Sequence, residues 1–276
     1  MAVGLVMIGA GIGAGIFGSL LGLGGGILLV PLLTLGFGLP LREAAGISLI
    51  CVIVTSSAAA SVYLQRHVAN LRLGMTLELF TALGAIVGAV LAFTLGERQL
   101  DGLFALLLAY VALTMIRRRD PEPEAPLAPA PAADEEVDEP PEGGILDRLS
   151  GPGYRVHSLG PGVVGSVGAG VVSALFGIGG GLVKVPVLHL IMGVPLRIAT
   201  ATSNLMIGVT ASASAIIYLV RGGIDPYVAG PTAIGVFVGA SIGSRIAGRV
   251  DVRFLRILFT VVLLYTAFEM LQRALS

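Results

Sequence analysis

Two stretches of the chain share a pattern of glycines and proline that is suited to binding an anion. Each reads G-x-G-G-G-x-x-x-V-P, one over Gly22–Pro31 and the other over Gly177–Pro186. Glycine and proline interrupt helices, and a helix that restarts after a break presents backbone N–H groups and a partial positive charge. Glycine also lets an anion approach the backbone closely, although the alternative is that it only lets helices cross tightly. The predicted backbone donors belong to Gly24, Gly25, Gly26, Gly179, Gly180 and Gly181.

Hydroxyl and amide side chains follow each glycine stretch and are candidate donors to the same anion. Serine and threonine in membrane helices usually bond back to the preceding turn, so ligand contact and intrahelical bonding both stay open. A primary amide deep in lipid is costly unless it has a partner, which favours a functional role for the one asparagine among them. The candidates are Ser48, Thr202, Ser203 and Asn204.

Ionisable side chains within apolar segments form a third group of candidates. Lys184 is the only lysine of the chain and follows Gly181 by three residues. If the glycines lie at mid-depth, Lys184 pairs with the anion or with a carboxylate; if the short helix lies near the surface, its ammonium reaches water. Glu78, Glu269 and His189 are candidates for proton coupling. The alternatives are carboxylates at the membrane boundary and a histidine that serves packing.

The composition indicates what must position these residues. The chain has 276 residues, of which 55% are hydrophobic and 12% charged, and its mean hydropathy is +0.94. A soluble domain carries roughly 25% charged residues, and runs of about 20 apolar residues span a bilayer. The sequence therefore predicts an all-α polytopic membrane protein. The net charge of zero gives no attraction to nucleic acid, and a lone cysteine, Cys51, excludes an intrachain disulfide.

Catalytic and cofactor motifs are missing from the sequence. Gly46–Leu49 is not a nucleophile elbow, and Gly181–Lys184 lacks the upstream pattern and the hydroxyl of a phosphate loop. Three histidines and one cysteine form no recognisable metal set. We therefore expect no enzyme, no cofactor and no metal, and the lack of a nucleotide motif argues against an ATP-driven pump.

The chain divides into two similar halves and a linker. A shift of 155 residues places Gly18–Ser48 over Ser173–Ser203, with the glycine triplets and both prolines in register. The predicted units are a first transmembrane repeat (1–116), a disordered or interfacial linker (117–160) and a second transmembrane repeat (161–276). The linker is rich in proline and glutamate and buries too little apolar surface to fold, whereas 145–159 is expected to lie along the membrane surface.

Length and charge predict that the two repeats are inverted. The first apolar block of each half is too long for one span, so we interpret it as a helical hairpin broken at the glycines, either re-entrant or fully spanning. Three further spans then give each half an odd number of crossings. With the linker cytoplasmic, 12 of the 16 arginines lie inside, against 9 in a parallel arrangement. Both termini are then extracytoplasmic.

The repeated motif resembles that of the TauE/SafE sulfite exporter family of anion permeases. The resemblance covers both halves and nearly the whole chain outside the linker. It rests on Gly22, Gly24, Gly25, Gly26, Val30, Pro31 and Leu33 in the first copy, and on Gly177, Gly179, Gly180, Gly181, Val185, Pro186 and Leu188 in the second. It implies transport of sulfite, of sulfonates such as taurine or sulfoacetate, or of other small organic anions. Ala45, Ile47 and Leu49 stand where the second copy has Thr200, Thr202 and Asn204, so the first half-site is less polar.

The resulting hypothesis is a secondary transporter in a bacterial inner membrane. It binds a small anion between its halves and works by alternating access, with proton coupling as one option. An uncoupled anion channel and a non-transporting membrane scaffold are the alternatives. Paired helix breaks argue against the scaffold, because a scaffold has no need of interruptions at mid-depth.

Overall fold

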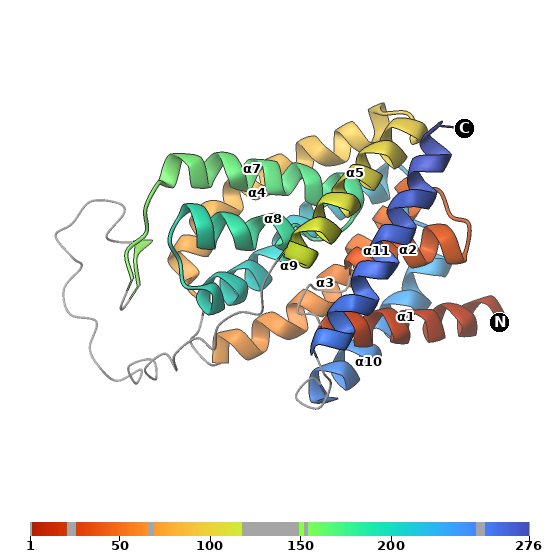
Figure 1. Ribbon diagram of the computed structural model, residues 1–276, viewed down its shortest axis with the longest axis horizontal. Coiled ribbons are helices and arrows are strands. Elements are labelled where there is room, and N and C mark those ends of the chain that lie inside the picture. The colour runs from red at the N-terminus through yellow and green to blue at the C-terminus, as the bar shows by residue number, and fades with distance from the viewer. Residues whose placement is uncertain are drawn as a thin grey trace.

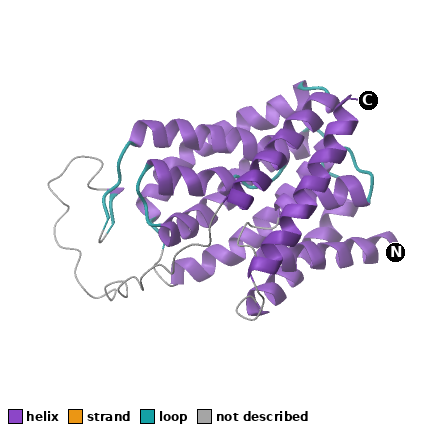
Figure 2. Ribbon diagram, in the orientation of Figure 1, coloured by secondary structure: helices purple, strands orange, loops and turns teal. Residues whose placement is uncertain are grey.

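The structure, a computed structural model, describes residues 2–20, 26–65, 69–117, 149–151, 154–246 and 252–275. These residues are almost entirely helical and contain no β-strand (Figure 2). Six of the described helices are long and apolar enough to cross a bilayer. The prediction of an all-α polytopic membrane protein is confirmed.

The first half consists of a broken pair of helices followed by three long ones. The broken pair is α1 (Ala2–Leu20) and α2 (Gly26–Pro31), which continues as the π-helical segment η1 (Leu32–Gly36). The long helices are α3 (Leu41–Gln65), α4 (Leu71–Thr94) and α5 (Glu97–Arg117). Each of the three is long enough, at about 1.5 Å per residue, to span the hydrocarbon core of a membrane.

The second half repeats this order. Its broken pair is α7 (Leu159–Phe176) and α8 (Gly181–Pro186), which continues as η2 (Val187–Ile191). The long helices are α9 (Leu196–Val220), α10 (Pro226–Ile246) and α11 (Val252–Leu275). The π-helical segments begin directly after Pro31 and Pro186, because proline has no N–H to continue the α-helical hydrogen-bond ladder.

The two halves are interlocked (Figure 1). α1 packs along α10, and α7 packs along α4, so the first helix of each half lies against the second long helix of the other. α3 packs on α9 and α5 on α11. Every long helix is therefore packed against a helix of the other half, and the sequence duplication is matched by a duplicated set of contacts.

Glycines allow the closest of these contacts. A Cβ atom at any of four glycines on α4 and α10 would overlap a backbone carbonyl oxygen of the neighbouring helix, so the helices could not approach as they do with a larger residue. The sequence predicts this packing role for all four. The glycines and the residues whose carbonyls they face are Gly84 with Val167, Gly88 with Val171, Gly235 with Ile8, and Gly239 with Ile12.

On α1 the same prediction was wrong in register. The spacing of glycines in the sequence also predicts close contacts at Gly9 and Gly13, but a Cβ at either would meet nothing within 4 Å. The contacts are made by Gly11 and Gly15, against carbonyls of α10. The cause is the helical period: residues two apart on a helix point to nearly opposite faces, and glycines occupy both faces of α1.

Replacing a glycine by valine should therefore affect stability differently on α10 and on α1. Gly235→Val should destabilise the protein by about 1–3 kcal/mol, because its side chain forces α1 and α10 apart. Gly9→Val is the matched control and should change stability by less than about 0.5 kcal/mol. Cys51 is buried, so a thiol-reactive fluorogenic dye reports unfolding of detergent-solubilised protein. Equal melting temperatures of the two variants would contradict the helix contact described here.

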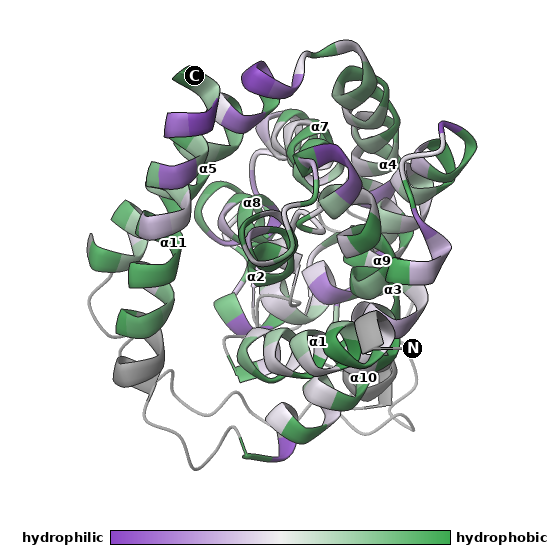
Figure 3. Cartoon of the chain, turned by 90° about the vertical axis from the view of Figure 1, so that its right-hand side faces the viewer, coloured by the Kyte–Doolittle hydropathy of each residue, from purple (hydrophilic) through white to green (hydrophobic). Residues whose placement is uncertain are grey.

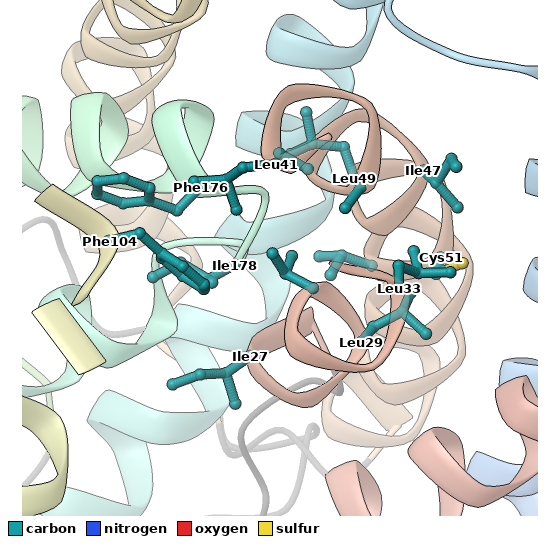
Figure 4. Packing of buried hydrophobic residues seen from close by; sticks show 14 of the residues in the cluster. Ile27, Leu29, Leu33, Leu41, Ile47, Leu49, Cys51, Phe104, Phe176 and Ile178 are labelled. Atoms are coloured by element: carbon teal, nitrogen blue, oxygen red, sulfur yellow. The ribbon is translucent and has the colours of Figure 1, made fainter. Parts of the chain in front are cut away.

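The broken helices occupy the centre of the bundle. Seen along the bundle, α2 and α8 are surrounded by the long helices, with α5 and α11 on one side (Figure 3). Phe104 of α5 packs against Phe176 at the end of α7, with ring centroids 5.3 Å apart, close to buried Ile27 and Ile178 (Figure 4). Apolar side chains thus enclose both helix breaks on the α5 side.

The segment that precedes α7 packs on the protein. Leu149 and Val156 are buried, and the Asn70 side chain donates hydrogen bonds to the Leu149 carbonyl at 2.8 Å and to the Tyr154 hydroxyl at 2.7 Å. The described part of this segment thus joins a cluster of apolar side chains of the protein, and its position along the membrane surface stays a prediction. Residues 118–148, the remainder predicted to be disordered, lie outside the described residues.

Both ends of the chain lie at the same end of the bundle, on different sides of it (Figures 1 and 3). The first turns of α1 and the last turns of α11 are at one end of the bundle, and the start of α7 is at the opposite end (Figure 1). The inverted orientation of the repeats and the side of the membrane that each end faces stay predictions.

Candidate functional site

The second glycine stretch forms a sharp turn between two helices. α7 ends at Phe176 and α8 begins at Gly181, and the turn between them holds Gly177, Gly179 and Gly180 at φ of +66°, +77° and +75°. Residues with a Cβ rarely adopt these values, so the glycines are required by backbone conformation. The predicted helix break is confirmed here. In the first half, Gly24 and Gly25 lie outside the described residues, and Gly26 is the first residue of α2.

The two helices flanking this turn form a hairpin. α8 and η2 make one continuous helical segment, Gly181–Ile191. At the end of the hairpin away from the glycine turn, the backbone N–H of His157 donates to the Met192 carbonyl at 3.1 Å. Near the turn, the Tyr218 hydroxyl donates to the Ala174 carbonyl at 2.9 Å. The hairpin therefore begins and ends at the same place and carries its glycine turn at the tip.

The tips of the two broken pairs meet. A Cβ built on Gly26 would lie 2.9 Å from the Gly177 carbonyl oxygen. The Ser48 hydroxyl donates to that carbonyl at 2.7 Å and lies 3.3 Å from the Gly26 carbonyl oxygen. Ser48, a predicted ligand, thus directs its proton to the junction of the two tips. The junction is where the interlocked halves present their helix breaks to each other.

Two buried hydroxyls border the tip of the second hairpin. A Cβ on Gly180 would lie 3.4 Å from Ser173 Oγ, and one on Gly181 would lie 3.7 Å from Ser203 Oγ. Neither oxygen has a hydrogen-bond partner among the described residues, although both side chains are buried. Buried hydroxyls almost always have a partner. Ser203 was among the predicted ligands, and Ser173 was not. A signal for Ser173 was its place in the motif, four residues before Gly177.

A buried triad of polar side chains, Lys184, Glu78 and Thr210, lies beside the same hairpin. The Lys184 ammonium is 3.1 Å from Glu78 Oε2 and donates to Thr210 Oγ1 at 2.5 Å. The Thr210 hydroxyl in turn donates to Glu78 Oε1 at 2.6 Å. The three groups form a closed ring, with Lys184 only 1% and Glu78 7% exposed. Such a pair persists in an apolar interior because each charge compensates the other.

The triad decides between the alternatives left open for its members. Lys184 does not reach water at the surface but pairs with a carboxylate inside the protein. Glu78, for which a place at the membrane boundary was the alternative to proton coupling, is buried inside the protein. Thr210 was not among the predicted ligands; its hydroxyl oxygen lies 2.6 Å from Glu78 Oε1, closer than the 3.2 Å to the Met206 carbonyl oxygen of its own helix.

Two predicted ligands, Thr202 and Asn204, form hydrogen bonds with the protein itself. Thr202 Oγ1 accepts a hydrogen bond from the backbone N–H of Asn70 at 2.9 Å, at the start of α4. The Asn204 side chain donates to the Thr200 carbonyl one turn earlier at 3.1 Å, which provides the partner that a buried amide needs. Of the predicted polar ligands on α9, only Ser203 therefore has a hydroxyl that no described residue engages.

The other two candidates for proton coupling lie apart from the triad. His189 Nδ1 lies 2.9 Å from the Val194 carbonyl oxygen, within the turn that follows η2, so this histidine serves the local backbone. Glu269 is on α11, which packs against α5. No group of three or more His, Cys, Asp or Glu residues suited to a metal ion occurs in the described ranges.

The comparisons with known proteins agree with this architecture. The family model of sulfite exporter TauE/SafE matches residues 7–270. The probable membrane transporter protein YunE of Bacillus subtilis is 21% identical over 281 residues, covering 98% of this chain and 98% of its own length. A probable membrane transporter protein of Methanocaldococcus jannaschii is 26% identical, covering 90% of this chain and 88% of its own length.

A third relative, a probable membrane transporter protein of Xylella fastidiosa, is 28% identical, covering 89% of this chain and 85% of its own length. No solved structure matches the chain. The match extends from within α1 to within α11 and so includes both halves of the protein. The chain belongs to the sulfite exporter TauE/SafE family of membrane proteins.

Proposed function

We propose that this protein is a secondary transporter of sulfite, an organosulfonate or a related small organic anion, and that it binds the anion at the Gly180–Gly181 tip. The proposal places the protein in a bacterial inner membrane, with the linker cytoplasmic and both termini outside. A cysteine introduced in place of Glu135, in a Cys51→Ala background, should then resist a membrane-impermeant maleimide applied to whole cells. Labelling of this cysteine from outside would show that the linker is extracytoplasmic and would contradict the proposed orientation.

The unpartnered hydroxyls of Ser173 and Ser203 are the observation that carries the proposal. They lie beside the start of α8, Ser173 next to Gly180 and Ser203 next to Gly181, where the first N–H groups have no acceptor within their own helix. A site that combines free hydroxyl donors, free backbone donors and the positive end of a helix dipole favours an anion. An anion bound there would lie inside the helical bundle, among buried side chains of both hairpin helices and α9.

A sulfonate or sulfite group matches this donor set. It has several acceptor oxygens and a low net charge, so it needs many hydrogen bonds but little countercharge. The helix N-terminus supplies about half a unit of positive charge, and the Lys184 ammonium lies in the same hairpin. Apolar walls formed by residues such as Val52 and Ile207, which lie against Gly179, suit the organic part of a sulfonate.

The arrangement of the two halves supports a carrier that works by alternating access. The helix breaks of both halves meet at Gly26 and Gly177, and helices of the two halves pack closely against each other at glycines. Rocking of one half against the other exposes a site at this junction first to one side and then to the other. An open anion channel needs no such interlocked halves, and for this reason the carrier is the favoured function.

Removal of the two hydroxyls tests the site. Replacing both Ser173 and Ser203 by alanine should weaken binding of ethanesulfonate about 100-fold or more, because each hydrogen bond to a charged group contributes about 1.5–3 kcal/mol and tenfold in affinity is about 1.4 kcal/mol. Folding should be retained, since neither hydroxyl has a protein partner that would be orphaned. Isothermal titration calorimetry of the purified protein measures the affinity.

Ser212→Ala is the matched control for this experiment. Ser212 lies on α9 as Ser203 does, but its hydroxyl donates to the Gly208 carbonyl of its own helix at 2.7 Å. This variant should bind ethanesulfonate as the wild type does. Unchanged affinity in the Ser173 and Ser203 double variant would place the anion site elsewhere.

A further inference from the structure

The buried triad lies level with the hairpin tip. Ile207 packs against the tip, with side-chain atoms 3.0 Å or less from where a Cβ of Gly179 or Gly181 would lie. Thr210 follows Ile207 on α9 by three residues, about 4.5 Å further along the helix axis. Lys184 lies in the first turn of α8, where its backbone N–H bonds to the Gly180 carbonyl. Because side chains on a helix tilt toward its N-terminus, the Lys184 ammonium is directed back toward the tip and toward Thr210.

The triad is electrically neutral as it stands. One ammonium faces one carboxylate, and the Thr210 hydroxyl links them. A singly charged anion that enters the tip therefore meets a lysine whose charge is already compensated. The result would be one uncompensated negative charge in an apolar interior, which is strongly unfavourable. The charge balance is restored if the carboxylate releases the lysine and accepts a proton.

Other titratable side chains are not placed to supply that balance. α7, which packs on α4, has no titratable residue, and Arg72 of α4 is exposed. On α9, Arg197 precedes Thr210 by about 20 Å along the helix axis, and the Tyr218 hydroxyl donates to the Ala174 carbonyl. His189 of η2 faces the Val194 carbonyl. Among the described residues that pack around the tip, Glu78 is the carboxylate that faces Lys184.

We propose that Glu78 competes with the transported anion for Lys184 and Thr210, and that the displaced carboxylate takes up one proton each time an anion binds. This inference rests on the proposed function. The proton comes from the aqueous solution on whichever side the site is open to, and it is released when the anion leaves and Glu78 returns to Lys184. Anion and proton then cross the membrane together, and the site stays neutral when empty and when loaded. No bond other than the carboxyl O–H forms or breaks.

Proton counting by calorimetry tests this coupling. Ethanesulfonate is the probe, because it stays ionised between pH 6 and 8 and brings no proton of its own. Titrations in two buffers that contain no sulfonate and differ in ionisation enthalpy, such as Tris and bicine, give the number of protons taken up per anion. We expect one proton for the wild type. We also expect its affinity to rise about tenfold for each unit by which the pH falls, as linkage requires for one proton.

Two variants then locate the proton. Glu78→Gln should take up no proton, and it should bind ethanesulfonate about tenfold or more tightly at neutral pH, because the competing charge is gone. Glu269→Gln, which removes the other carboxylate within an apolar span, should still take up one proton per anion. If Glu78→Gln does not fold, the proton count and the pH dependence of the wild type decide the coupling without it.

The outcomes separate this inference from the proposed function. Binding of ethanesulfonate by the wild type without proton uptake would overturn the coupling and leave the anion site in place. Proton uptake that survives in Glu78→Gln would also overturn it, since another group would then carry the proton. No binding of ethanesulfonate or sulfite by the folded wild type would overturn both.

Discussion

We expect Lys184→Met to lower the stability of the folded protein by about 3–5 kcal/mol, because the substitution leaves the Glu78 carboxylate buried without its countercharge. For a chain of this size the change corresponds to a fall in melting temperature of about 10 °C. The loss should become smaller as the pH falls, because protonation of Glu78 removes the unpaired charge. Reaction of Cys51 with a thiol-reactive dye during heating gives the melting temperature.

A double variant separates the loss of charge balance from the loss of packing. Replacing Glu78 by glutamine and Lys184 by methionine removes both charges, so the protein should regain most of the stability lost in the single variant. If Lys184→Met were as stable as the wild type at pH 8, the buried Glu78 carboxylate would not need Lys184 as its countercharge. That result would contradict the structure of the triad.

We expect Gly180→Val to reduce anion binding and flux at least a hundredfold while the protein still inserts and folds. Gly180 has a φ of +75°, which a β-branched residue adopts only with strain. Its Cβ would also lie 3.1 Å from Ser173 Cβ and 3.2 Å from the Ala169 carbonyl oxygen. The valine methyl groups would then fill the space between the tip backbone and the Ser173 hydroxyl, where the anion is proposed to bind.

Gly168→Val is the control for this substitution. Gly168 is on the same hairpin, in α7, but it is exposed and a Cβ there would meet nothing within 4 Å. This variant should bind and transport at wild-type levels, as measured by titration and by uptake into proteoliposomes. Equal activity of the two variants would mean that the glycine tip serves only packing.

The sequence predicted the features of this site that depend on the local backbone. Glycine and proline interrupt helices for backbone reasons, so the break at Gly177–Gly181 could be predicted from residue type. The duplicated pattern also predicted a matching break in the first half, where α2 begins at Gly26. The order of elements in each half follows from the same reasoning, because apolar runs of sufficient length form membrane helices.

The pairing of side chains across helices could not be predicted in the same way. Lys184 and Glu78 are separated by 106 residues, and Glu269 was an equal candidate partner by composition. Lys184 pairs with Glu78 because α4 and α9 pack together beside the hairpin. No local sequence pattern specifies that packing. For the same reason, Thr202 was assigned to the ligand although its hydroxyl binds the backbone of Asn70.

Hydroxyl groups were the hardest to place. Ser173 has no hydrogen-bond partner among the described residues, Thr210 bonds to Glu78, and Ser212 bonds back to its own helix. These residues look alike in an apolar sequence, because serine and threonine can always bond to the preceding turn. Only the neighbouring helix decides whether the hydroxyl turns outward, and that neighbour is set by tertiary packing.

Counterflow of sulfite in proteoliposomes tests the central claim, an anion carrier with a site between its halves, most directly. Vesicles that contain the purified protein and are preloaded with unlabelled sulfite should take up external ³⁵S-labelled sulfite faster, and transiently to a higher level, than vesicles without internal sulfite. A carrier returns its site fastest when it is loaded, so internal substrate stimulates uptake. Uptake without this stimulation would indicate a channel, and uptake no greater than in protein-free vesicles would contradict transport of sulfite by this protein.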